Sequence, residues 1–357
     1  MTAATKSYNE VFMKKIIILA FCLLISFLTV SCSSEGDLPA SEQQITDTVS
    51  SDEASVRDLF AMDTLMTLKA YGEDREGALS EAALKITELE KLFSATDEES
   101  EIWKASHSGG KTVSVSEETA EVLSFMLDIS FKTNGALDPT VCPVVREWGF
   151  TTGKYKIPEQ DVIDSLLQLT GYEKVKLNGN ELTLPEGMML DLGASAKGYT
   201  GDVVSDIFRR HGVSSAVISL GGNVQTVGSR PDGTDWKVAV RDPLDESEQL
   251  CIVSVSDKAV VTSGNYERYF TGEDGKRYCH IIDPSDGYPA DNGIASVTVI
   301  SESGILCDCL STALFVMGKD KALEYQKKHG GFEMIIVSSE NEVTYTEGLE
   351  GKIELVK

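Results

Sequence analysis

The chain has few basic residues for its content of acidic ones. Lys and Arg total 32 against 57 Asp and Glu, which gives a formal net charge of −25. Proteins that bind nucleic acid through its phosphates need a basic surface, so this class of protein is excluded. A phosphate-bearing ligand is still compatible with the charge, provided that a metal ion or backbone N–H groups reverse the field locally.

Patterned cysteines are also lacking. The seven cysteines form no C-x-x-C pair and no spacing typical of a zinc site. Cys307 and Cys309 are separated by one residue, which is an awkward spacing for a disulfide. The 357 residues, 41% of them hydrophobic, are enough for a sizeable core and exclude a wholly disordered chain. We therefore expect no disulfide framework and predict that most cysteines are small, buried apolar residues.

The longest apolar run, residues 16–30, has 15 residues, fewer than the roughly 20 that a bilayer-spanning helix needs. It follows Lys14 and Lys15 and ends just before Ser31 and Cys32. This order predicts a secretory signal peptide over residues 1–31, with Met13 as the possible start. The segment 28–32 resembles a bacterial lipobox, which predicts lipid modification of Cys32. An uncleaved signal anchor and an ordinary secreted protein are the alternatives.

Residues 32–56 are predicted to form a flexible acidic tether behind the lipidated cysteine. They contain almost no large apolar groups, so they cannot bury enough surface to offset the entropy of ordering. We expect the protein to be lipid-anchored to the bacterial cell envelope, facing the periplasm or the exterior. Because the acidic body would repel an anionic membrane, attachment would depend on the lipid.

The remaining chain, residues 57–357, is expected to be a single α+β domain with mixed or antiparallel sheets and packed helices. Apolar residues at three- and four-residue steps predict a helix at 76–93. Further helices are expected at 119–131, 161–170, 199–211 and 308–328, and strands at 215–220, 236–240, 251–255, 259–261, 296–300 and 332–337. Strands thus concentrate in the second half of the chain, which favours α+β over a regular βαβ alternation.

Several segments combine glycines, carboxylates and hydroxyl groups. In 191–199, small residues precede a helix start, where free N–H groups could face an anion, although the Walker spacing is absent. The Gly221–Gly222 pair after a strand could be a hairpin turn or a ligand-facing loop, and Asp138–Pro139 is most often a turn. His280 is one of only four histidines; a lone histidine is more often structural than catalytic.

Asp308 and Thr312 are four residues apart at the start of a predicted apolar helix, so both oxygens face the same way. An N-cap Asp with an incidental Thr is one reading of the pair. The other is a site for a hard cation, since Mg²⁺ prefers oxygen ligands and commonly takes one or two carboxylates while substrate phosphates complete its shell. A metal ion would also let this acidic protein hold a phosphate.

Taken in order, the segments 136–150, 191–199, 219–223, 262–270, 280–289 and 308–318 resemble the FAD:protein FMN transferase (ApbE) family. The resemblance extends from about residue 58 to the carboxyl end. It implies one α+β domain, often a bacterial envelope lipoprotein. It also implies cleavage of the FAD pyrophosphate with Mg²⁺, attachment of FMN by a phosphoester bond to a Thr or Ser of a target protein, and release of AMP. The acceptors would be proteins of membrane redox complexes.

The resemblance also implies roles for individual residues. His280 would be the proposed base, and Asp308 would act in catalysis as a metal ligand. The Mg²⁺ ligands would be the carbonyl of Ala194 with Asp308, Thr312 and Ser311. Contacts with FAD would come from Met62, Thr96, Ala136, Leu137, Asp138, Asp191, Lys197 and Ile282.

The sequence departs from the family pattern at Thr96, where an aromatic residue is usual. An aromatic ring there could stack on a flavin or adenine and help to exclude water. Its loss leaves room for water to replace the acceptor hydroxyl. The alternatives to a transferase are therefore a Mg²⁺-dependent FAD pyrophosphatase, which would give FMN and AMP, and a lipoprotein that binds FAD without catalysis.

Overall fold

The structure is a computed structural model that describes residues 53–356. The predicted signal peptide, Cys32 and most of the predicted tether lie outside the described residues. The first strand, β1 (Ser55–Ala61), already begins two residues before the predicted domain start at 57. Within residues 53–356, no helix has both the length and the apolar character that crossing a bilayer requires.

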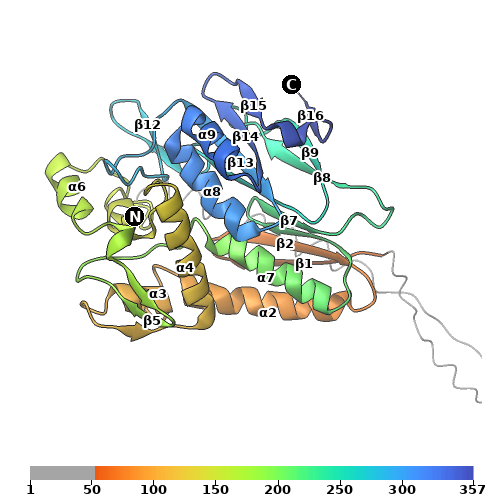
Figure 1. Cartoon of the computed structure of the whole chain (residues 1–357), viewed down its shortest axis with the longest axis horizontal. Helices are drawn as coiled ribbons and strands as arrows, with labels where there is room; N and C mark the ends of the chain where they lie inside the picture. The colour runs from red at the N-terminus through yellow and green to blue at the C-terminus, as the bar shows by residue number, and fades with distance from the viewer. Residues whose placement is uncertain (1–52, 357) are drawn as a thin grey trace, which may run out of the picture. The chain divides into compact units, whose positions relative to one another are not determined.

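An eight-stranded antiparallel sheet forms the centre of the domain (Figure 1). Its order is β1–β2–β6–β7–β10–β13–β14–β15, and each pair of neighbours is antiparallel. After β1 the strands are β2 (Thr64–Tyr71), β6 (Ser215–Leu220), β7 (Asn223–Val227), β10 (Ala259–Gly264), β13 (Ile294–Ser301), β14 (Glu333–Ser338) and β15 (Val343–Tyr345). The expected α+β class is confirmed, with antiparallel pairing throughout the described strands.

Three helices cover one face of this sheet, namely α2 (Arg75–Phe93), α7 (Ala196–Arg210) and α8 (Gly304–Met317) (Figure 1). Strands alternate their side chains between faces, so Met66, Leu68 and Ala70 of β2 all point toward α2 and are fully buried. In α2, Ala82 and Ile86 are equally buried because the four-residue step keeps them on one helix face. The predicted helical period of this segment is confirmed.

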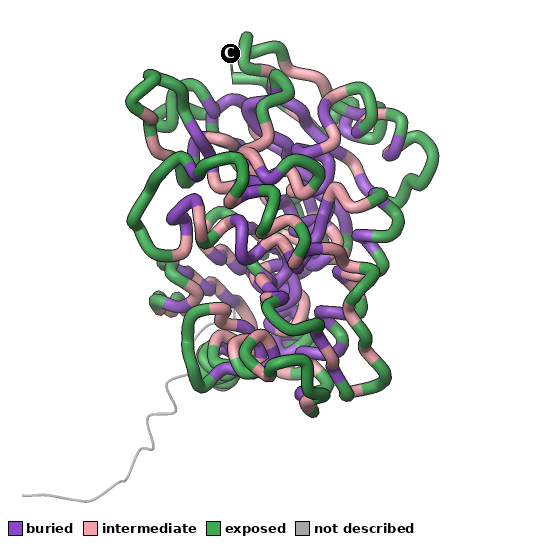
Figure 2. The backbone as a smooth tube through the Cα atoms, turned by 90° about the vertical axis from the view of Figure 1, so that its left-hand side faces the viewer, coloured by how far each residue is buried: buried purple, intermediate pink, exposed green. Residues whose placement is uncertain are grey.

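A smaller sheet covers the opposite face. It contains β8 (Trp236–Arg241), β9 (Gln249–Val255) and β16 (Ile353–Leu355), in the order β16–β9–β8. Val253 and Val255 of β9 pack against Val260 and Ile300 of the large sheet. The central strand β13 is therefore buried on both faces, and every one of its eight residues is buried. Figure 2 shows these buried stretches inside a shell of exposed loops.

The remaining helices and short strands surround this core (Figure 1). They are α3 (Glu101–Ser106), α4 (Glu117–Lys132), α5 (Cys142–Glu147), α6 (Gln160–Leu167), α9 (Lys319–His329), the strands β3 (Val113–Ser114), β4 (Lys176–Asn178) and β5 (Glu181–Thr183), and the hairpin β11 (Tyr269–Thr271)–β12 (Arg277–Cys279). Helix α9 packs against α8. The short 3-10 turns are η1 (Pro139–Val141), η2 (Tyr172–Lys174) and η3 (Glu347–Leu349).

Three expectations need correction. The single helix predicted at 308–328 is two helices, α8 and α9, because Gly318 between them has a φ of +85°, which no helical residue adopts. The helix predicted at 161–170 ends earlier, as α6. The β1–β2 hairpin was not predicted, since strands were expected only from residue 215 onward.

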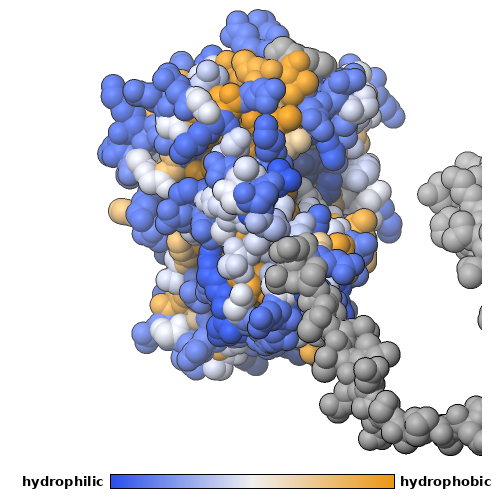
Figure 3. Space-filling model, turned by 90° about the vertical axis from the view of Figure 1, so that its right-hand side faces the viewer, coloured by the Kyte–Doolittle hydropathy of each residue, from blue (hydrophilic) through white to orange (hydrophobic). Residues whose placement is uncertain are grey.

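The prediction for the cysteines is confirmed within the described residues: all five there are buried and free. The face of the domain drawn in Figure 3 is mostly hydrophilic.

Candidate active site

A cleft of about 550 Å³ opens at the end of the large sheet where the β1–β2 turn and the start of β7 lie. The walls come from segments far apart in the chain: the loop after α2, residues 136–151, residues 191–197, the end of β10, residues 280–284 and α8. Its size is within the usual range of ligand-binding pockets. Segments singled out by the sequence thus meet at one place.

Nearly all predicted site residues line this cleft. They are Met62, Thr96, Ala136, Leu137, Asp138, Asp191, Ala194, Lys197, His280, Ile282, Asp308 and Thr312. Ser311 is the exception. It is fully buried behind the wall, where its hydroxyl lies 2.8 Å from the Ser263 hydroxyl and donates to the carbonyl of Asp308 at 3.0 Å. Ser311 therefore supports the wall, while its neighbour Thr312 reaches the cleft.

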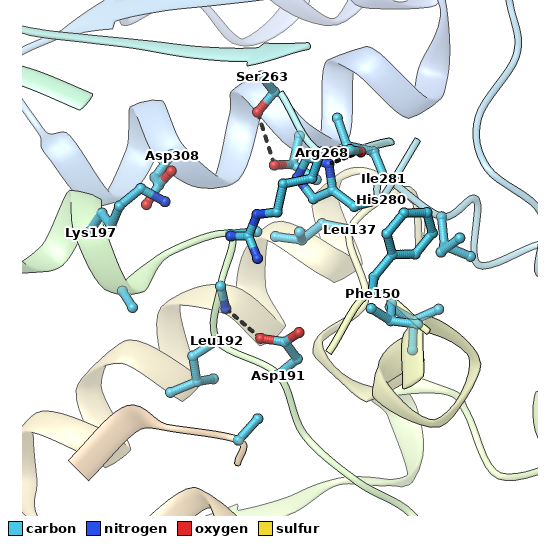
Figure 4. Close-up of a pocket in the computed structure, with 18 of the residues that line it drawn as sticks. Leu137, Phe150, Asp191, Leu192, Lys197, Ser263, Arg268, His280, Ile281 and Asp308 are labelled. Atoms are coloured by element: carbon cyan, nitrogen blue, oxygen red, sulfur yellow. Dashed lines mark hydrogen bonds between the residues drawn. The ribbon is translucent and has the colours of Figure 1, made fainter. Parts of the chain in front are cut away.

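Asp308 occupies the point where α7 and α8 touch. One of its oxygens, Oδ2, accepts a hydrogen bond of 2.8 Å from the backbone N–H of Gly198. That N–H belongs to the first turn of α7, where helix N–H groups have no acceptor in their own helix. Among the described residues none donates to the other oxygen, Oδ1, so it is left for a ligand in the cleft. Figure 4 shows Asp308 and Lys197 projecting from these two helices.

The two helices can approach this closely because glycines stand at the contact. A Cβ on Gly198 would lie 2.3 Å from the carbonyl oxygen of Gly304 and 2.7 Å from the Cβ of Asp308. A Cβ on Gly304 would lie 2.4 Å from the carbonyl oxygen of Gly198. Any side chain at either position would push the helices apart, so the place of Asp308 depends on both glycines.

The N-terminus of α8 is fixed by a carboxylate that the sequence did not reveal. Asp202 of α7 accepts hydrogen bonds from the N–H groups of Gly304, at 2.7 Å, and Ile305, at 3.0 Å. Ser303 is the N-cap residue and accepts from the N–H of Leu306. Since α8 begins at Gly304, the reading of Asp308 as an N-cap is wrong.

Residues 191–197 form a tight turn into α7. Asp191 accepts a hydrogen bond from the N–H of Gly193 at 2.8 Å (Figure 4), and its own N–H donates to the carbonyl of Pro139 at the same distance. Ser195 is the N-cap of α7. The described backbone offers no donor to the carbonyl of Ala194, which lies just before that cap. This carbonyl is thus available as a ligand.

Asp138 is buried at the base of the cleft and accepts three hydrogen bonds. The donors are the N–H and hydroxyl of Thr140, at 2.8 and 2.6 Å, and the N–H of Tyr172, at 3.0 Å. Burial raises the pKa of this carboxyl group, and the hydrogen bonds act against that rise. The turn expected at Asp138–Pro139 is present as η1, and it places Ala136, Leu137 and Asp138 on the wall.

His280 presents a neutral imidazole. Its Nδ1 lies 3.2 Å from the backbone carbonyl of Arg268 (Figure 4). Because a carbonyl can only accept, Nδ1 carries the proton and Nε2 keeps a free lone pair. Burial by the cleft walls lowers the pKa of His280 to about 4, and the positive charges of Arg268 and Lys197 act in the same direction. The geometry suits a proton acceptor.

Met62 and Thr96 lie at the rim. Met62 and Asp63 form the β1–β2 turn, with φ of +50° and +58°, and the N–H of Met62 donates to Glu90 at 2.6 Å. Two consecutive residues with positive φ are typical of a type I′ hairpin turn, whose twist suits the flanking strands. Thr96 is exposed in the loop after α2, and its N–H donates to the Ser94 hydroxyl at 3.2 Å.

Sequence reasoning did not select several other lining residues, among them Asn223, Arg268 and Phe150. Asn223 and Arg268 lie in segments that were selected from the sequence for their glycines and hydroxyl groups. Their position in those segments could have marked them as lining residues. The lining is strongly acidic. Two basic residues, Lys197 and Arg268, face six carboxylates: Asp63, Glu90, Asp138, Asp191, Glu267 and Asp308.

Comparison with known proteins identifies the family of this chain. The family model for the ApbE family matches residues 62–336. The chain belongs to the ApbE family of flavin transferases. It is 33% identical over 287 residues to the FAD:protein FMN transferase of Klebsiella pneumoniae, which covers 79% of this chain and 88% of that protein. It is 32% identical over 250 residues to that of Vibrio cholerae, with coverages of 66% and 74%.

Solved structures agree. The ApbE protein of Thermotoga maritima superposes with a TM-score of 0.79 at 31% identity, covering 84% of this chain and 99% of that one. The flavinyl transferase ApbE of Pseudomonas stutzeri gives 0.76 at 28% identity, covering 84% and 97%. The resemblance stated from the sequence, and with it the single α+β fold, is confirmed.

Proposed function

We propose that this chain is a Mg²⁺-dependent FAD:protein FMN transferase. The observation that carries the proposal is the position of Asp308, held by Gly198 with one oxygen free, in the same cleft as Thr312, Ala194 and the neutral His280. In the reaction, the hydroxyl oxygen of a Thr or Ser on an acceptor protein bonds to the phosphorus of the FMN half of FAD. The bond from that phosphorus to the bridging oxygen breaks, and AMP leaves.

The residues of the cleft divide this work. Nε2 of His280 takes the proton from the attacking hydroxyl, because the imidazole is neutral near pH 7. Lys197 and Arg268 are the basic residues of the lining, and their positive side chains attract the phosphates of FAD. Met62, Thr96, Ala136, Leu137, Asp138, Asp191 and Ile282 are proposed to bind the rest of FAD.

The donors around Asp308 suit Mg²⁺. The described residues contain no group of three or more His, Cys, Asp or Glu side chains that could hold a metal. A single carboxylate with the Thr312 hydroxyl and the Ala194 carbonyl, supported by Ser311, is a set of hard oxygen donors that leaves room for substrate phosphates. Bound there, Mg²⁺ would neutralise charge on the pyrophosphate and stabilise AMP as it leaves.

A second candidate function is FAD pyrophosphatase activity, and Thr96 favours it. This residue is exposed on the cleft lining, and its small side chain cannot shield that part of the site from solvent as an aromatic ring would. Water could then take the place of the acceptor hydroxyl and give FMN and AMP. Transfer and hydrolysis share every other group of the site.

We further propose that the enzyme works at the bacterial cell envelope, anchored through a lipid on Cys32 and facing the periplasm or the exterior. The motif of the signal segment and the acidic tether support this location. The acceptors would be proteins of membrane redox complexes that carry a flavinylated Thr or Ser. The excess of acidic residues argues against nucleic acid as a partner.

The decisive experiment incubates the protein with FAD, Mg²⁺ and a Thr-containing acceptor from such a complex. AMP is measured by chromatography and covalent flavin by mass spectrometry of the acceptor. A transferase releases one AMP per flavinylated acceptor, whereas a pyrophosphatase releases AMP and free FMN whether or not acceptor is present. A protein that binds FAD but releases no AMP with Mg²⁺ or Mn²⁺ would contradict both enzymatic functions.

Asp308→Ala tests the site assignment. It should abolish AMP release, because the single carboxylate of the proposed metal site is removed. The matched control is Asp320→Ala, which removes an exposed carboxylate from α9, outside the cleft, and should leave AMP release unchanged. Equal AMP release by the two variants would overturn the assignment.

A further inference from the structure

A buried amide in the cleft has no hydrogen-bond partner. Six buried side-chain nitrogen or oxygen atoms of the described residues lack one, and two of these belong to residues that line the cleft, Thr151 and Asn223. The atom of Asn223 is its Nδ2, and the residue is only 7% exposed. Buried N–H donors in folded proteins are nearly always satisfied, by protein, water or ligand. The donor itself is enclosed in this conformer, so a partner in the cleft would reach it once the amide turns about its last side-chain bond.

The strand places this amide beside the proposed metal site. Asn223 is the first residue of β7, and side chains two apart in a strand point to the same face. Gln225, two residues on, donates through Nε2 to Asp202 of α7 at 2.8 Å. Asn223 therefore lies on the face of the sheet that carries α7 and α8, the helices of Lys197 and Asp308.

The hairpin turn itself does not explain an asparagine here. The turn uses Gly221 and Gly222, whose φ values of +62° and +102° require glycine-like freedom. Asn223 follows the turn and is not among the residues with positive φ. The turn geometry therefore does not require an asparagine at this position.

The charge of the cleft indicates what the donor binds. Six carboxylates against two basic side chains make the lining unfavourable for an anion. A neutral amide adds a hydrogen-bond donor at the phosphate without competing with a bound cation, as a further lysine would. Building on the proposed function, we propose that the Asn223 amide turns toward the cleft when FAD binds and that its Nδ2 donates a hydrogen bond to a phosphoryl oxygen of the pyrophosphate.

An asparagine could instead turn its Oδ1 toward the metal, and two substitutions separate these roles. Asn223→Ala removes both atoms. Asn223→Asp keeps an oxygen for a metal but loses the donor and adds a negative charge that repels phosphate. Asn178→Ala and Asn178→Asp are matched controls, because Asn178 is exposed on β4 and does not line the cleft.

The measurement compares dissociation constants for FAD and for riboflavin, which lacks phosphate, from flavin fluorescence with EDTA and with Mg²⁺. We expect Asn223→Ala to weaken FAD binding about 10-fold, as for loss of a hydrogen bond to a charged group, and Asn223→Asp to weaken it further. Riboflavin binding should stay within error for both variants, and so should the melting temperature of Asn223→Ala. Asn223→Asp buries a carboxylate and should melt at a lower temperature. The Asn178 pair should not differ from wild type.

Three results would overturn the inference. Equal losses for FAD and riboflavin would mean a general effect on the cleft, and a lower melting temperature with unchanged FAD binding would mean a structural role. Retained FAD binding in Asn223→Asp, with half-activation at lower Mg²⁺, would assign the side chain to the metal. If the wild-type protein neither binds FAD nor releases AMP, the proposed function itself fails, and this inference falls with it.

Discussion

Gly198→Ala should separate the two helices that carry the proposed metal site. In an ordinary helix this substitution stabilises by about 1 kcal/mol, because Ala has the higher helix propensity. Here the new Cβ would lie 2.3 Å from the carbonyl oxygen of Gly304. Ordinary van der Waals contact for such a pair begins near 3.4 Å. The helices must therefore move apart by roughly 1 Å, and the hydrogen bond from Gly198 to Asp308 is stretched with them.

The magnitude follows from two effects. Overpacking at a tight contact typically costs about 1–3 kcal/mol of unfolding free energy, which exceeds the gain in propensity. For a domain of this size we expect a fall in melting temperature of a few degrees. The catalytic effect should be larger, because a displacement of about 1 Å at a catalytic group can reduce the rate about 100-fold. A small loss of stability should thus accompany a large loss of AMP release.

The assay measures AMP release as a function of Mg²⁺ concentration, together with thermal unfolding. Gly77→Ala is the matched control. It is also a helical glycine, in α2, but the three atoms nearest to a Cβ there all belong to the exposed side chain of Asp74, which can move at little cost. This control should be neutral or slightly stabilising and fully active. If Gly198→Ala behaves like Gly77→Ala in both measurements, the reasoning about the glycine contact is refuted.

Three further predictions concern single side chains. Burial lowers the pKa of His280 to about 4, against about 6.5 in the unfolded chain. Between these pH values the unfolded state binds more protons, so the free energy of unfolding should rise from pH 4 to pH 6.5. In denaturant titrations, the variant His280→Gln should show a flatter rise. Thr96→Tyr should lower the ratio of free FMN to flavinylated acceptor, and an unchanged ratio would remove Thr96 as the cause of hydrolysis. In Asp202→Asn an amide oxygen replaces the charged acceptor at the start of α8, so the free energy of unfolding should fall by about 1–3 kcal/mol. The Mg²⁺ concentration needed for half-activation should also rise. Full activity at the Mg²⁺ concentration that suffices for the wild type would contradict this prediction.

Features that depend on residues close together in the sequence were predicted well. The spacing of Asp308 and Thr312 placed both on one side of α8, and the apolar period of 76–93 gave α2 nearly to its ends. Both patterns depend on neighbours three or four residues apart. The break at Gly318 was missed because apolar residues continue the helical period on each side of it.

Long-range pairing was harder to predict. Phe60 and Leu65 are paired across the β1–β2 hairpin, and both are exposed although they are apolar. The alternation of apolar and polar residues that marks a half-buried strand is therefore obscured in this segment. Its partner β6 lies about 150 residues away, beyond any local signal. The support of α8 by Asp202, and the unused donor of Asn223, likewise exist only once distant segments meet.

The acidic lining of the cleft has a consequence for the end of the proposed catalytic cycle. Breaking a pyrophosphate creates an additional negative charge on the departing nucleotide. Burial raises the pKa of Asp138 and Glu267, which favours their neutral forms, but the other lining carboxylates would repel that added charge. The cleft should therefore hold the product less firmly than the substrate. Low ionic strength should therefore hasten dissociation of AMP rather than slow it, and inhibition by added AMP should grow stronger as salt screens the repulsion.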